Sequence, residues 1–200
     1  MSDDRELVAA AQAGDADAMN DLLARHYDRV HAVCRRIAGA QRDADDAAQE
    51  AMIRIARNIG RFDGRSQFGT WVYRIATNAA LDELRRRRRR PDLRLVDEDD
   101  EAKTTESPDP IADRLIDAIA DREAIDAALD ELPEEFRVAV VLRDVHDLDY
   151  AEIADVLEIA VGTVKSRIAR GRRQLVERLG NPPTTSGRPT DGPDRPRHDT

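Results

Sequence analysis

The sequence predicts an all-α protein built from two small helical domains. Apolar residues recur at helical spacing along most of the chain, and hydrophobic residues make up 40% of it but aromatic residues only 4%. An acidic stretch that contains prolines interrupts this pattern, and 200 residues suit two small domains better than one. We therefore expect domains over residues 5–90 and 118–180, an acidic flexible linker over 91–117 and a disordered tail over 181–200.

In the first domain, the spacing of apolar residues predicts one short helix followed by three longer ones. Gly14-Asp15 breaks the first periodic stretch, and we expect Asp15 to cap the second helix. Asp43 is the expected N-cap of the third helix. The fourth helix is expected over about 67–89, because Pro91 then stops it.

The linker and the tail are assigned from composition. Residues 91–117 carry 10 acidic and 3 basic side chains, whereas residues 181–200 are rich in Pro, Gly, Thr and Asp. Helical spacing returns at about Ile111, and Pro133 is expected in the first turn of a later helix.

Two further helices, about 149–157 and 162–179, are separated by a short turn, which is helix-turn-helix spacing. The expected apolar face of the second helix contains Val161, Val164, Ile168, Leu175 and Leu179. Its opposite side carries Lys165, Ser166, Arg167, Arg170 and Arg173. Since three of these recur at i, i+4 and i+7, they form a stripe that fits a DNA major groove. The alternative is a solvated basic face on a bundle helix.

A second basic surface lies on the helix over 67–89. Arg74 and Asn78 are one turn apart on a stripe that leads into six consecutive arginines, which begin with Arg85 and Arg86. Single-stranded nucleic acid requires cations for its phosphates and aromatic or amide groups for its bases. Trp71 either supplies such a ring or packs in the core. The arginines have a second interpretation, a solvated helix end favoured by the helix dipole.

Residues suited to catalysis are not grouped in the sequence. The four histidines are scattered, Cys34 has no neighbouring base or metal-ligand cluster, and no Gly-rich phosphate loop follows a strand. We therefore expect a protein that is not an enzyme and has no catalytic residue, metal, cofactor or small-molecule substrate. A run of about 18 apolar residues does not occur, so we expect a cytoplasmic protein without membrane insertion.

Three segments together resemble the extracytoplasmic-function (ECF) sigma factors, small members of the sigma-70-type family of bacterial RNA polymerase subunits. Asp43–Ala51 is similar to the region 2 helix that binds the polymerase clamp. Phe68–Arg90 resembles the helix that melts and reads the minus-10 promoter element. Leu132–Arg167, which contains the helix-turn-helix, resembles region 4, which reads the minus-35 element. The three matches follow the order of the family, which is more specific than any one of them.

This resemblance implies roles for individual residues. Core polymerase would be bound by Asp46, Gln49 and Glu50. Asn78 and the loop over 61–67 would hold a flipped base of the minus-10 element, and the rest of that surface would be Arg74, Trp71, Arg85 and Arg86. Minus-35 DNA would be contacted by Lys165, Ser166, Arg167, Arg170 and Arg173. The implied partners are core RNA polymerase, promoter DNA and an anti-sigma factor.

Two other classes of function stay open beside that of a sigma factor directing promoter-specific initiation. An independent helix-turn-helix regulator would explain the second domain but leave residues 43–90 without a role. A sigma-mimicking module that captures a regulator would not need the retained DNA-facing residues, notably Asn78, Lys165, Arg167 and Arg170.

Overall fold

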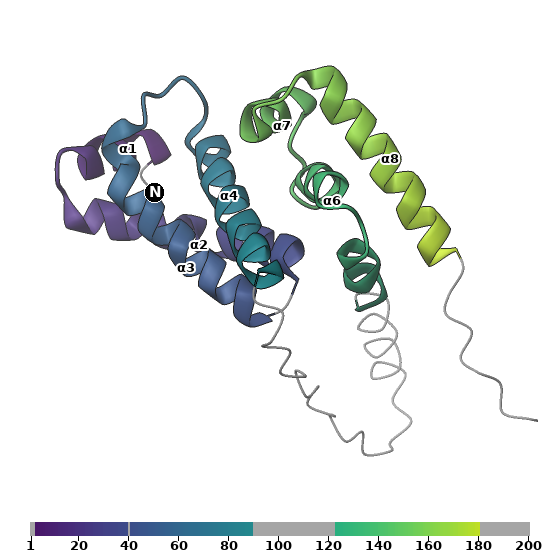
Figure 1. The fold of residues 1–200 in the computed structure, drawn as a ribbon. Helices are drawn as coiled ribbons and strands as arrows, with labels where there is room; N and C mark the ends of the chain where they lie inside the picture. The colour runs from purple at the N-terminus through teal and green to yellow at the C-terminus, as the bar shows by residue number, and fades with distance from the viewer. Residues whose placement is uncertain (1–2, 40, 90–122, 181–200) are drawn as a thin grey trace, which may run out of the picture.

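The structure, a computed structural model, describes residues 3–39, 41–89 and 123–180. Every regular element within these ranges is a helix, which confirms the predicted all-α fold (Figure 1). The predicted linker over 91–117 and the predicted tail over 181–200 lie outside the described residues.

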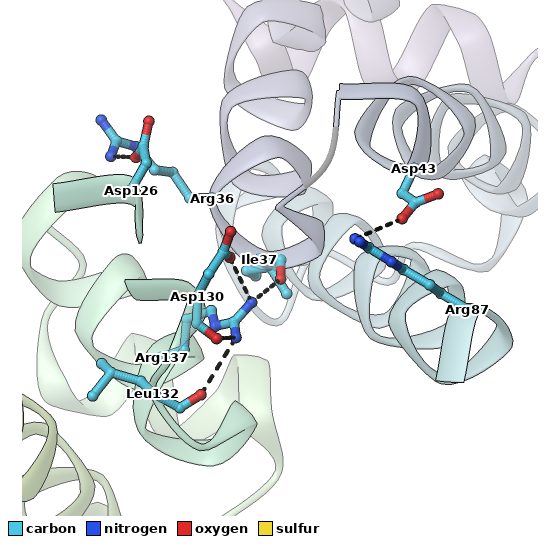
Figure 2. A network of polar contacts seen from close by, with 8 residues as sticks. All are labelled: Arg36, Ile37, Asp43, Arg87, Asp126, Asp130, Leu132 and Arg137. Atoms are coloured by element: carbon cyan, nitrogen blue, oxygen red, sulfur yellow. Dashed lines mark hydrogen bonds and ion pairs between the residues drawn. The ribbon is translucent and has the colours of Figure 1, made fainter. Parts of the chain in front are cut away.

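The N-terminal unit consists of α1 (Asp4–Gln12), α2 (Ala16–Ala38), α3 (Gln41–Asn58), the short 3-10 turn η1 (Ile59–Arg61) and α4 (Phe68–Arg88). The Asp15 carboxylate accepts hydrogen bonds from the backbone N–H groups of Asp17 (2.9 Å) and Ala18 (3.0 Å), which confirms the predicted cap of α2. The predicted N-cap at Asp43 is wrong, because α3 already begins at Gln41. Asp43 instead lies in the first turn of α3, where its charge complements the helix dipole, and it pairs with Arg87 of α4 at 3.2 Å (Figure 2).

Small side chains line the contacts among α2, α3 and α4. The buried residues of α3 include four alanines, Ala44, Ala47, Ala48 and Ala51, and those of α4 include Ala76, Ala79 and Ala80. Because alanine projects little beyond the backbone, the helices approach one another closely. Burial raises the pKa of the Cys34 thiol to about 12, so this residue of α2 packs as a small neutral hydrophobe.

The C-terminal unit contains α6 (Glu134–Val140), the π-helical turn η2 (Val141–Val145), α7 (Tyr150–Leu157) and α8 (Val161–Leu179). Residues 123–130 are also helical. Pro133 directly precedes α6, one position earlier than predicted. Asp149 and Glu152 form a reciprocal capping box at the start of α7, in which each side chain accepts a backbone N–H at 2.8 Å.

The predicted helix-turn-helix is formed by α7 and α8. In the turn, Glu158 has a left-handed backbone conformation (φ 54°, ψ 42°) that glycine adopts more readily. The buried side of α8 is limited to its inner turns, at Val164, Ile168 and Gly171. Val161 and Leu179, the first and last residues of the expected apolar face, are exposed.

The two units pack against each other: α4 lies beside α7 (Figure 1), and α2 contacts both α6 and η2. Arg137 of α6 is central to this contact and is only 4% exposed. Its Nη1 donates to the carbonyl oxygen of Ile37 in α2 (2.9 Å) and pairs with the Asp130 carboxylate (3.0 Å). Its Nη2 donates to the carbonyl oxygens of Asp130 and Leu132 (Figure 2). Burial lowers the pKa of Arg137 and Asp130 opposes this shift, so the guanidinium stays charged and bound to several oxygens.

Glycine permits two of the close approaches in the fold. Gly39, which ends α2, has φ 83°, and a Cβ at this position would lie 2.8 Å from the Asp130 carboxylate. A Cβ at Gly171 in α8 would lie 2.6 Å from Cγ2 of Val140 and 3.3 Å from the backbone oxygen of Phe136, both in α6. Because Gly171 has no side chain, α6 and α8 can approach each other this closely.

We predict that Gly171→Ala destabilises the protein. Val140 is buried and β-branched, so it cannot move aside without disturbing its neighbours. The overpacking outweighs the better helix propensity of alanine, and the expected loss in the free energy of unfolding is about 1 to 2 kcal/mol, measured by urea denaturation. The control is Gly162→Ala in the same helix, where a Cβ meets nothing within 4 Å and stability should not fall. Equal stability of both variants would contradict the close packing.

Candidate nucleic-acid interface

The polar stripe on α4 is partly open to solvent. The Asn78 side chain is exposed and makes no hydrogen bond within the described ranges. Arg74, one turn earlier, is half-buried because its Nη1 approaches the Glu158 carboxylate at 3.4 Å. The amide of Asn78 is therefore available to a ligand, whereas the guanidinium of Arg74 lies against the turn of the helix-turn-helix.

Trp71 belongs mainly to the core. It is 9% exposed, and its ring centroid lies 5.4 Å from that of Phe62 and 5.5 Å from that of Phe68. Aromatic pairs at this separation are attractive beyond the area that they bury. Of the two roles considered for Trp71, packing accounts for most of its surface.

One edge of Trp71 still reaches a cavity of about 650 Å³ between the N-terminal part of α4 and the turn before α8. The loop side of the cavity is formed by Asp63, Arg65 and Ser66, and the opposite side includes Asp155, Glu158 and Ala160. The predicted base-holding loop thus faces an open space that is lined by both units. Its charged lining consists of three carboxylates, Asp63, Asp155 and Glu158, and two guanidinium groups, Arg65 and Arg74.

The arginines at the end of α4 are each engaged by a carboxylate. Arg85 lies 3.6 Å from Asp82 and 3.5 Å from Glu134, and Arg86 pairs with Glu83 at 2.9 Å. Arg88 also pairs with Glu134, at 3.3 Å, so α6 contributes one carboxylate to two arginines of α4. The arginine side chains are more than half exposed, whereas the carboxylates of Glu134 and Glu83 are only 21% and 11% exposed. The arginines can therefore reach phosphates from the surface, while the carboxylates stay within the protein.

On α8, four of the five predicted contact residues lie exposed on its outer side: Lys165, Ser166, Arg170 and Arg173. Within the described ranges, neither Arg170 nor Arg173 has an ion-pair partner. Lys165 Nζ lies 5.5 Å from the centre of the Tyr150 ring, and the Ser166 hydroxyl donates to the Thr163 carbonyl at 2.9 Å. Arg167 differs, since it turns toward α6 and pairs with Glu135 at 3.0 Å.

The exposed side of α3 carries the residues predicted to bind a protein partner. Asp46 and Gln49 are exposed and make no polar side-chain contact within the described part of the chain. Glu50 is half-buried and accepts a hydrogen bond from Arg54 Nε at 2.8 Å, while Arg54 also reaches Asp82 of α4 at 3.0 Å. Arg54 therefore couples α3 to α4 and engages Glu50, whereas Asp46 and Gln49 are available to a partner.

Sequence reasoning missed the carboxylates that cover the basic residues, chiefly Glu134 and Glu158. The only signal was the position of Glu158 in a turn where glycine is common. In the described ranges, no group of three His, Cys, Asp or Glu side chains could hold a metal ion, and no helix is both long and apolar enough to cross a membrane.

Helical units that present two basic surfaces, one of them on a helix-turn-helix, define the class of DNA-binding transcription proteins. Comparison with known families narrows this class. Residues 22–90 match the model of sigma-70 region 2, and residues 122–175 match that of sigma-70 region 4. The chain belongs to the ECF RNA polymerase sigma factor family, as the resemblance of its three segments indicated. Sigma factors are non-enzymatic regulators of transcription.

Similar proteins cover nearly the whole chain. The ECF RNA polymerase sigma factor SigW of Bacillus subtilis is 35% identical over 184 residues, which span 88% of this chain and 96% of SigW. SigM of Mycobacterium tuberculosis is 39% identical over 177 residues, which span 88% of this chain and 85% of SigM.

Solved structures show the same architecture. CnrH, solved in complex with the cytosolic domain of CnrY, superposes with a TM-score of 0.64 at 27% identity, over 88% of this chain and 97% of CnrH. RpoE of Bartonella quintana, solved with the anti-sigma factor NepR, gives a TM-score of 0.62 at 22% identity, over 80% and 96%, which supports the fold alone.

His146 lies where the two units meet. Its ring centroid is 5.3 Å from that of Tyr73 in α4, and its buried Nε2 has no hydrogen-bond partner among the described residues. Burial lowers the pKa of His146, Arg36 and Arg29 of α2 lower it further, and only Asp147 opposes them. A proton on this imidazole would therefore be stabilised less in the packed arrangement than in a solvated one.

We predict that acidification weakens the packing of the two units. The folded pKa of His146 is below its unfolded value of about 6.5. The stability that the neutral imidazole gives to the packed arrangement is therefore fully present above pH ~6.5 and is lost as pH falls through the folded pKa. The radius of gyration from small-angle X-ray scattering should rise with decreasing pH, and His146→Gln should reduce this change. His31→Gln, at a partly exposed histidine paired with Asp45, is the control and should behave like the unaltered protein. A pH dependence unaffected by His146→Gln would contradict the assignment.

Proposed function

We propose that this sigma factor binds core RNA polymerase through α3 and directs initiation at promoters that it reads with α4 and α8. The observation that carries the proposal is the pairing, in one chain of this family, of two exposed DNA-compatible helices with a separate exposed acidic helix face. Residues 5–90 act as region 2, residues 118–180 as region 4, and residues 91–117 connect them. The chain acts in the bacterial cytoplasm, where its polymerase and promoters are found, and has no catalytic activity of its own.

Region 2 melts and reads the minus-10 element. Asn78 is exposed one helical turn after Arg74, which lines the cavity together with Trp71, and an amide can both donate to and accept from a base edge. Because a base edge in a pocket can be read only after the base leaves the stack, the loop over 61–67 and Asn78 hold a flipped base. Arg74, Arg85 and Arg86 neutralise the neighbouring phosphates.

Region 4 reads the minus-35 duplex with α8 in the major groove. Ser166, Arg170 and Arg173 lie on its exposed side, and the arginine fork matches the two acceptors of guanine. Lys165 supplies phosphate contacts at the start of the helix. Arg167 also contacts the DNA after its ion pair with Glu135 breaks, so that a phosphate replaces the carboxylate.

The arginines of the α4 surface are freed from the C-terminal unit only when the two units separate, whereas the stripe on α8 is already exposed. In the packed arrangement, Glu158 covers Arg74, and Glu134 lies between Arg85 and Arg88. Promoter DNA and core polymerase therefore bind a separated arrangement, in which phosphates replace these carboxylates. An anti-sigma factor that covers these surfaces would oppose that exchange, and such a partner is the one that membership of this family implies.

The proposal is tested by run-off transcription with purified core polymerase on a library of promoter fragments, with and without this protein. Initiation that depends on the protein and shares a two-part sequence motif is the expected result. The absence of initiation, together with tight duplex binding in the absence of polymerase, would instead favour an independent helix-turn-helix regulator.

We predict that Asn78→Ala impairs promoter opening but not polymerase binding. Loss of one base-reading contact should cost about 1 to 3 kcal/mol on an intact template. On a template that is already melted around the minus-10 element, the defect in initiation should be smaller, because the cost of opening is removed. The control is Asn20→Ala, at an exposed amide of α2 outside the interface. Equal defects on the intact and melted templates would contradict the role of Asn78 in opening.

We predict that Arg170→Ala weakens binding to a minus-35 duplex by about 1 to 3 kcal/mol, because the substitution removes a guanidinium that contacts a base in the groove. The measurement is a binding titration of the holoenzyme at fixed salt concentration. Arg178→Ala, near the end of the same helix, removes a guanidinium that already pairs with Glu131 at 3.0 Å and should leave the affinity unchanged. An unchanged affinity for Arg170→Ala would remove this residue from the interface.

A further inference from the structure

The end of α1 is tied to the turn from which the loop over 61–67 begins. The side-chain amide of Gln12, the last residue of α1, donates to the carbonyl oxygen of Ile59 at 2.9 Å and to that of Phe62 at 2.8 Å. One nitrogen thus joins the first residue of η1 to the residue that directly follows it. The family match begins at residue 22, so α1 lies outside it.

The two carbonyls fix the point at which the loop leaves the bundle. The oxygen of Ile59 also accepts the backbone N–H of Phe62 at 3.1 Å, which closes the turn. The ring of Phe62 packs edge-on against Phe68 at 5.3 Å and lies against Trp71, so it connects the turn to the first residues of α4. A shift of η1 would therefore move the start of the loop relative to the polar stripe of α4.

The opposite end of α1 is held as well. Asp4 lies 2.9 Å from Nε2 of His26, a buried residue of α2 whose ring meets Phe68 edge-on at 5.1 Å. Between the two ends, Leu7, Val8 and Ala11 are buried against the bundle. Because α1 is fixed along its length, Gln12 can transmit that fixed position to η1.

We propose, on the basis of the function inferred above, that Gln12 is a positioning residue for minus-10 recognition. It holds η1 so that the distance between the loop over 61–67 and Asn78 stays fixed. The site for the flipped base is therefore already ordered before DNA binds. Gln12 acts through Ile59 and Phe62 and does not itself read DNA. Since the Gln12 side chain is exposed, water can hydrogen-bond to the carbonyl oxygens of Ile59 and Phe62 when Gln12 is replaced. The replacement therefore leaves the fold intact.

The first experiment uses the fluorescence of Trp71, the single tryptophan of the chain, in the full-length free protein. Gln12→Met keeps the length of the side chain and removes both donors, so the turn loosens and the acrylamide quenching constant of Trp71 rises about twofold. Asn20→Met, which replaces an exposed amide of α2 that has no hydrogen-bond partner in the described ranges, is the matched control and leaves quenching unchanged. Gln12→Lys restores a donor able to reach carbonyl oxygens and returns quenching toward its original value. An unchanged quenching constant in Gln12→Met would overturn the proposal.

The second experiment measures holoenzyme binding to two DNA probes taken from a promoter found by run-off transcription. Gln12→Met weakens binding to the single-stranded minus-10 oligonucleotide about fivefold, and binding to the minus-35 duplex is unchanged. Raised Trp71 quenching with unchanged oligonucleotide affinity would overturn the positioning role. If the unaltered chain fails to support initiation, it is the proposed function that fails, and the fluorescence result alone still decides whether Gln12 holds the turn.

Discussion

The alanine-lined packing of α3 and α4 around α2 determines what the rest of the molecule can present. With Ala76, Ala79 and Ala80 turned into the bundle, the helical period leaves Arg74 and Asn78 on another side of α4. Large side chains at the alanine positions would separate the helices and rotate this stripe. The constraint also explains the single cysteine, since a small residue is needed between α2 and α4, where the Cys34 sulfur lies 3.8 Å from the Ala76 carbonyl oxygen. DNA-compatible chemistry on α4 is thus a consequence of tight packing behind it.

The contact between the two units combines one strong interaction with several weak ones. Arg137 is buried and bound to oxygens of both units, and breaking such a cluster without replacement costs several kcal/mol. The pairs of Arg74, Arg85 and Arg88 with carboxylates of the C-terminal unit are at its exposed edge and contribute little individually. Separation therefore has to rehydrate or re-pair Arg137, whereas the peripheral arginines exchange readily. A partner that binds to the separated units supplies this free energy, since binding to one state shifts the population toward it.

Local signals in the sequence predicted most of the helices, and contacts between distant residues account for the errors. Asp15 caps α2 through its own neighbours, so the sequence was sufficient there. Asp43 pairs instead with Arg87, 44 residues away, and nothing near Asp43 indicates this. The position of Arg137 against Ile37 depends on how the two units meet, which no period of apolar residues encodes. The π-helical turn η2 was not indicated by the sequence pattern either. In the same way, the exposed stripe of α8 was predictable, whereas the turning of Arg167 toward Glu135 was not.

Glu158 shows that the turn of the helix-turn-helix is not optimised for stability alone. A non-glycine residue in the left-handed conformation costs about 1 to 2 kcal/mol. Its ion pair with Arg74 spans 3.4 Å and its carboxylate side chain is 75% exposed, so the pair returns less than about 1 kcal/mol. The conformational cost thus equals or exceeds the gain, and glycine would make a more stable turn. Glutamate here places a negative charge opposite the basic stripe of α4, where it makes the packed arrangement depend on charges that DNA can replace.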